Sequence, residues 1–99
     1  MIYLCSCKDP KAAKTSFKVW GNCEMCKETI ETSLKTEGIK EANWNVDSKI
    51  IHVSFDSTKI SVDAIQHLIA NSGYDNDKYK GSDSAYFNLP ECCQYTRKP

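Results

Sequence analysis

The order of hydrophobic repeats along the chain constrains its fold more than any other feature. Apolar and polar side chains alternate through residues 15–20, with Phe17 and Val19 on one face, as a half-buried strand requires. Residues 24–38 instead carry apolar side chains every four positions, which is the spacing of one face of an α-helix. The chain therefore begins its ordered part with a strand followed by an amphipathic helix.

A second strand, third strand and second helix follow the first helix. Residues 39–46 and 51–55 both alternate and are separated by a polar turn, so they predict a β-hairpin. Ser61 is a suitable helix cap, the apolar residues of 62–69 have helical spacing, and Gly73 is a suitable stop. The sequence thus predicts a hairpin and then a second helix.

Residues 74–79 predict a fourth strand, although Asp and Asn are poor strand formers. The element order is then βαββαβ, and right-handed crossovers place both helices on one face of a four-stranded antiparallel sheet. This is an α+β, ferredoxin-like sandwich. We expect residues 1–14 to be a leader or linker, residues 15–79 to be the domain and residues 80–99 to be a C-terminal tail.

Size and charge exclude several classes of protein. A chain of 99 residues fits one small domain, since single domains run roughly 50 to 200 residues. Thirteen basic residues balance thirteen acidic ones, so no net field favours nucleic acid as a partner. Apolar stretches span only a few residues, against the roughly 20 that a transmembrane helix requires.

Six cysteines are many for so short a chain, and they fall in local pairs. The pairs are Cys5 with Cys7, Cys23 with Cys26, and Cys92 with Cys93. A disulfide framework that staples distant loops has a more scattered spacing. Local pairs indicate metal or redox chemistry.

Cys23 and Cys26 lie in the loop after the first expected strand and in the first turn of the first expected helix. A helix N-terminus supplies partial positive charge and unpaired N–H groups, which favour thiolate over thiol. Two thiolates without a histidine or carboxylate at ligand spacing suit a soft ion that accepts few ligands, such as Cu(I), better than a tetrahedral structural zinc. An acceptor with its own cysteine pair can add a sulfur before the first pair releases the ion. These residues therefore predict carriage of the ion rather than catalysis.

The segment FKVWGNCEMCKETIETSL at 17–34, together with NSGYD at 71–75, resembles the heavy-metal-associated domains of bacterial copper chaperones, copper-pump N-terminal domains and the periplasmic mercuric-ion-binding protein. The resemblance covers roughly residues 15–79. It implies metal transport or detoxification, Cu(I) as the ion with Hg(II) or Zn(II) as alternatives, and a metal-transporting ATPase or another cysteine-bearing acceptor as the partner. A monomer is expected, with a metal-bridged dimer as the alternative.

The resemblance also places further residues near the metal loop. Tyr74 is implied to lie close to it, and Asn22 and Met25 flank the cysteines, with Met25 offering a thioether or simply being exposed. Gly21 stands where the family usually carries Met. Since that Met packs beneath the loop and helps shape it, the departure weakens an assignment to copper alone.

The tail ends in LPECC, which resembles the ending of a subset of bacterial members of this family. A short helix is expected at 82–89 before Pro90. An extended chain spans up to about 3.4 Å per residue, so Cys92 and Cys93 can reach Cys23. They either join the metal site or form a secondary site, a vicinal disulfide or an intermolecular bridge.

The N-terminal Leu4-Cys5-Ser6-Cys7 fits the bacterial lipoprotein pattern, with Cys7 as the lipidated residue. The residues before it are fewer than the roughly 7 to 15 apolar residues of a signal peptide. The match is therefore either the end of a longer leader or chance, and a Cys-x-Cys metal site is the alternative. We expect a periplasmic or membrane-anchored lipoprotein of a bacterial envelope, with the cytoplasm as the alternative.

A thiol-disulfide oxidoreductase is the rival class, because it also places Cys-x-x-Cys at a helix start. Thioredoxin-like sites have Trp directly before the first Cys and a Pro against the disulfide. Here Trp20 lies three residues upstream of Cys23, and residues 11–89 contain no Pro. No paired carboxylates, Ser-His pair or phosphate-binding glycine loop is found, so we do not expect an enzyme.

Overall fold

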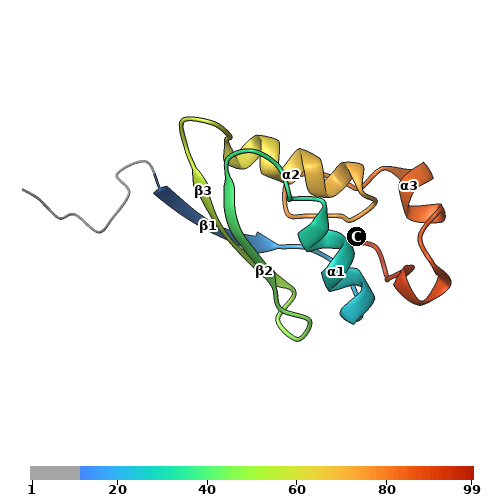
Figure 1. The fold of residues 1–99 in the computed structure, drawn as a ribbon. Coiled ribbons are helices and arrows are strands. Elements are labelled where there is room, and N and C mark those ends of the chain that lie inside the picture. The colour runs from blue at the N-terminus through green and yellow to red at the C-terminus, as the bar shows by residue number, and fades with distance from the viewer. Residues whose placement is uncertain (1–11) are drawn as a thin grey trace, which may run out of the picture.

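The computed structural model describes residues 12–99. Its elements in chain order are β1 (Ala12–Lys18), α1 (Glu24–Thr32), β2 (Ile39–Trp44), β3 (Ile50–Asp56), α2 (Val62–Asn71), α3 (Asp83–Phe87) and the short 3-10 helix η1 (Glu91–Cys93). Figure 1 shows α1 and α2 on one side of the sheet and α3 beyond them, and after α3 the chain turns back so that its C-terminus lies nearer to the sheet than α3. The predicted ferredoxin-like α+β arrangement is confirmed, apart from the last strand.

The sheet has the antiparallel order β1-β3-β2. Alternate residues of the central strand β3 are buried against the helices, namely Ile51, Val53 and Phe55, while His52 between them is exposed. β1 begins at Ala12, three residues before the expected start, because residues 12–14 pair with the end of β3. The ordered domain therefore extends into the expected linker.

The prediction of a fourth strand at residues 74–79 is wrong. Within residues 12–99, this segment forms a single β-bridge, between Asn76 and Val19. The segment does lie along β1, since Trp20 N–H donates to Asp75 O at 2.9 Å. The Asn76 side chain explains why pairing stops. Its Oδ1 accepts from the N–H groups of the residues two and three positions later, at 3.1 and 3.0 Å, so it bends the chain into a turn.

The bounds of α2 follow the sequence prediction, whereas the end of α1 does not. Ser61 caps α2 by accepting from Ala64 N–H at 3.1 Å, as predicted. Gly73 follows α2 with a φ of 102°, a conformation that side chains rarely tolerate. α1 stops at Thr32, earlier than the predicted end at residue 38, yet Leu34 remains in the core. Among residues 12–99, no helix has the length and apolar character that crossing a membrane demands.

The tail packs into the domain and completes its core. The Tyr95 ring stacks on Tyr74 with centroids 5.3 Å apart, and its hydroxyl donates to Gly73 O and accepts from Asp75 N–H, both at 2.7 Å. Arg97 binds the buried Asp75 carboxylate with two nitrogens, at 2.7 and 3.2 Å. These contacts fix the path of the chain directly after Cys93.

The Asp75–Arg97 pair predicts a pH dependence of stability. Burial alone raises the pKa of the Asp75 carboxyl, but hydrogen bonds from Arg97 and from the Gly81 and Lys98 N–H groups outweigh it and hold the pKa below its ordinary value of 3.8. A depressed folded-state pKa gives stability that is present above 3.8 and is lost as the pH falls through the folded value. We expect Asp75→Asn to lower the free energy of unfolding by roughly 2 kcal/mol at pH 7.

Urea unfolding of both proteins between pH 7 and pH 2 measures this effect. The difference between wild type and Asp75→Asn should shrink as the pH falls below 3.8. A difference that stays constant over this range would show that the charge of Asp75 does not hold the tail.

Candidate metal centre

The first two cysteines lie at the N-terminal end of α1. Cys23 is the N-cap residue, with extended backbone, and its carbonyl accepts the first helical hydrogen bond from Lys27 N–H at 3.1 Å. One turn later Cys26 is fully buried, whereas Cys23 is half-buried. Their Sγ atoms lie 3.6 Å apart, and both thiols are free. The helix start therefore aims one accessible and one buried sulfur at the same point.

The tail brings a third sulfur to this point. η1 packs against α1 and places Cys93 Sγ 3.9 Å from Cys23 Sγ. The sulfurs of Cys23, Cys26 and Cys93, here named the three-sulfur cluster, all lie within 4.8 Å of one another. Three sulfurs around one ion at about 2.3 Å would be about 4.0 Å apart, so the cluster has the dimensions of a trigonal thiolate site.

Cys92 points elsewhere. Its side chain is exposed, and its Sγ lies 3.3 Å from Met25 Sδ and 4.0 Å from Cys93 Sγ. Its backbone still takes part in the cluster, because the Cys23 thiol donates to Cys92 O at 3.5 Å. The two tail cysteines, which the sequence treats as a pair, thus face different surroundings.

The thiols differ in acidity. The backbone N–H of Cys26 hydrogen bonds to the Cys23 sulfur and lowers the pKa of that thiol, as expected at a helix start. Burial raises the pKa of the Cys93 thiol to about 12, and the Cys26 sulfur adds to this rise. Cys23 is therefore the readiest ligand, and Cys93 must lose its proton as an ion enters.

Asn22 holds the buried cysteine from the other side. The Cys26 thiol donates to Asn22 Oδ1 at 2.9 Å, and Asn22 N–H points at the same sulfur at 3.5 Å. Once Cys26 ionises, the side-chain bond loses its proton and the backbone N–H remains as the donor. Asn22, which the sequence placed near the site, thus touches the sulfur directly.

Tyr74 closes the inner side of the cluster. Its side chain is fully buried, and its hydroxyl makes no hydrogen bond of ordinary geometry with residues 12–99. Burial raises the pKa of this hydroxyl, and the nearby Cys26 and Cys93 sulfurs raise it further. An orphaned buried hydroxyl is costly, and a thiolate formed by Cys26 or Cys93 would give it a partner. This observation favours a charged, ion-loaded cluster.

Trp44 explains the glycine at position 21. A Cβ built on Gly21 would lie 2.9 Å from Trp44 Cη2 and 3.4 Å from the Cys26 Cβ. The indole is fully buried and donates from Nε1 to Val19 O at 3.0 Å. Trp44 therefore fills the space beneath the loop, and the loop keeps its support without a Met at this position.

We expect Gly21→Ala to destabilise the protein by about 1 to 3 kcal/mol, because the added methyl overpacks against the indole. Urea unfolding measures the loss. In a Trp44→Phe background, which removes the contacting indole atoms, the same Gly21→Ala change should cost less. An equal cost in both backgrounds would rule out the clash as its cause.

The other predicted residues lie apart from the cluster. His52 and His67 are exposed, as expected, and His67 stacks on Tyr79 with centroids 4.0 Å apart. Cys5 and Cys7 lie outside the described residues, so the lipid anchor on Cys7, the Cys-x-Cys site and the envelope location stay predictions.

Comparisons with known proteins show to which family the chain belongs. The model of the heavy-metal-associated domain matches residues 22–75. The copper chaperone CopZ of Bacillus subtilis (strain 168) is 34% identical over 55 residues, which cover 54% of this chain and 80% of that protein.

Two solved structures are similar in fold and sequence. The N-terminal domain of a potential copper-translocating P-type ATPase from Bacillus subtilis, in the Cu(I)-loaded state, has a TM-score of 0.63 and 26% identity, covering 75% of this chain and 95% of that one. Oxidized MerP from Ralstonia metallidurans CH34 has a TM-score of 0.63 and 25% identity, covering 67% and 94%. With the family model matching more than half of the chain, the protein belongs to the heavy-metal-associated domain family.

Proposed function

We propose that this protein carries Cu(I): Cys23 and Cys26 bind the ion, Cys93 retains it, and a cysteine-bearing acceptor receives it. The observation that carries the proposal is the convergence of three free thiols from two distant parts of the chain. Thiolates are the soft ligands that Cu(I) prefers, and three of them fall short of the four ligands of a structural zinc site. We therefore propose a carrier rather than an enzyme.

The unequal burial of the sulfurs supports release by ligand exchange. Cys23 is half-buried at the end of the helix, while Cys26 and Cys93 are buried. An acceptor thiolate can therefore bond to the ion from the Cys23 side before a bond to this chain breaks, and the released thiolate then takes up a proton from water. A metal-transporting ATPase is the acceptor that we propose, since a copper-pump domain is among the structural neighbours and a copper chaperone among the relatives.

An anaerobic competition titration tests this function. Fully reduced protein is titrated with Cu(I), Zn(II) and Hg(II), each against a chelator of known affinity. We expect tight binding of Cu(I) and a much weaker interaction with Zn(II). If the protein prefers Hg(II) or Zn(II) under equal competition, the proposal that it carries Cu(I) is overturned in favour of that ion.

The rival oxidoreductase is tested on the same reduced, metal-free protein. We expect it to reduce insulin no faster than an equal concentration of free dithiol. Insulin reduction at the rate of a thioredoxin would contradict the proposed carrier function.

A further inference from the structure

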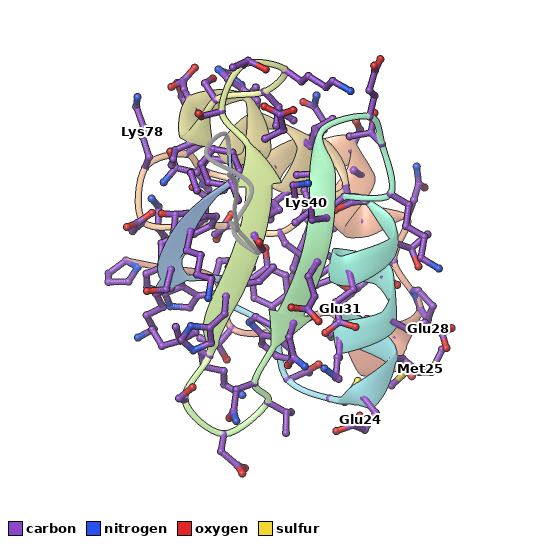
Figure 2. All side chains as sticks on the ribbon, turned by 60° about the vertical axis from the view of Figure 1, so that its left-hand side comes forward. Glu24, Met25, Glu28, Glu31, Lys40 and Lys78 are labelled. Carbon is purple, nitrogen blue, oxygen red and sulfur yellow. The ribbon has the colours of Figure 1, made fainter. Side chains whose placement is uncertain are left out.

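A second pair of sulfur atoms lies at the edge of the three-sulfur cluster. Cys92 Sγ and Met25 Sδ are 3.3 Å apart, although the two residues are 67 positions apart in the chain. We name Cys92 and Met25 the rim pair. Figure 2 shows Met25 beside Glu24 at the start of α1, projecting away from the sheet.

The rim pair is open to solvent. Met25 is 51% exposed and Cys92 is also exposed, so neither side chain belongs to the buried core. A thiolate and a thioether are both soft ligands that select Cu(I). Two sulfurs on one ion at about 2.3 Å would be about 4.0 to 4.6 Å apart, so the pair must open by about 1 Å. Exposed side chains can do this without moving the backbone.

The rim pair also continues the three-sulfur cluster. Cys92 Sγ lies 4.0 Å from Cys93 Sγ, which is itself 3.9 Å from Cys23 Sγ. A thiolate sulfur has more than one lone pair and can bind two soft ions at once. The Cys93 sulfur lies between the two sets and is the atom that they can share.

We propose that the chain binds a second Cu(I) at the rim pair, with Cys92 and Met25 as its ligands and the Cys93 sulfur shared with the first ion. The Cys92 thiol loses its proton to water as its bond to copper forms, and no electron is transferred. This inference rests on the proposed function, because the three-sulfur cluster fills first. The rim position is the more open of the two, so an acceptor can remove its ion first.

Native mass spectrometry during anaerobic titration with Cu(I) tests the proposal. All proteins carry Cys5→Ser and Cys7→Ser, so that these thiols do not add to the count. We expect a monomer that binds one and then two copper ions. Met25→Leu and Cys92→Ser should each bind one ion, with the affinity for that first ion changed less than about 3-fold, whereas the neighbouring Glu24→Gln should still bind two.

Selenomethionine labelling identifies the ligand directly. Met1 and Met25 are the two methionines of the chain. Selenium-edge X-ray absorption should show a copper neighbour after the second equivalent and not after the first. Labelled Met25→Leu, which keeps only Met1, should show none.

The outcomes separate this inference from the proposed function. A monomer that saturates at one ion, a second ion that persists in Met25→Leu, or a second ion found only in dimers would overturn the rim site and leave the carrier standing. Absence of any bound copper in the starting protein would overturn both.

Discussion

Replacing Cys23 and Cys26 together with serine is expected to weaken Cu(I) binding by more than roughly 1,000-fold. Changing groups that only orient a ligand costs about 10- to 100-fold in metal affinity, and this variant removes two of the three ligands themselves. Of the three-sulfur cluster only Cys93 would remain, and burial, the largest cause of the raised pKa of its thiol, would still disfavour the thiolate. Competition against a Cu(I) chelator measures the loss.

The fold needs its own control, because Cys26 belongs to the core rather than to a flexible surface loop. A serine there can still donate to Asn22 Oδ1, which lies 2.9 Å from the sulfur, so we expect a loss of about 1 to 3 kcal/mol without unfolding. Circular dichroism and urea unfolding check this. Cys23→Ser alone, at the half-buried position, should lose affinity at nearly full stability. A folded double variant with wild-type affinity would show that the ion binds elsewhere.

Periodicity was sufficient to predict the existence and order of β1, α1, β2, β3 and α2. The alternation in β3 and the helical spacing in α2 reflect burial of one face, which the structure shows at Ile51, Val53 and Ile65. The position of Cys23 and Cys26 at a helix start followed from the same pattern. The fourth strand failed because a single side chain, that of Asn76, captured the backbone N–H groups of the turn that follows.

The packing of the tail could not be predicted in this way. Tyr95 and Arg97 have no periodicity that marks them as core residues, and their partners, Tyr74 and Asp75, lie about 20 residues earlier. Asp75 is buried and so requires a cationic partner, but that burial is seen only in the structure. The length of the tail showed that Cys92 and Cys93 could approach the loop. It could not show that Cys93 turns toward Cys23 while Cys92 turns toward Met25.

Cys93→Ser is expected to leave one Cu(I) bound by two sulfurs and to weaken that binding by about 10- to 100-fold. The physical reason is that a third thiolate fixed on the same chain has an effective concentration in the millimolar range or above. Removing it leaves the ion open to competing thiols. X-ray absorption of the protein loaded with one equivalent should show a fall from three sulfur neighbours to two, and the ion should be lost faster to glutathione.

Proton release gives a further readout for the same variant. Because burial raises the pKa of the Cys93 thiol to about 12, this thiol is protonated at pH 7 in the metal-free protein. Loading wild type with one ion should therefore release one proton more than loading Cys93→Ser.

Serine variants of the two tail cysteines test retention more sharply than truncation after Asn88. Truncation would also remove Tyr95 and Arg97 and so expose Tyr74. A weaker affinity could then result from lost packing as well as from the lost ligand. Cys92→Ser is the matched control, since its Sγ is turned toward Met25 and outside the three-sulfur cluster. It should keep three sulfur neighbours around the first ion. If Cys93→Ser and Cys92→Ser lose that ion at the same rate and with the same sulfur count, Cys93 is not a ligand and the tail serves only to complete the core.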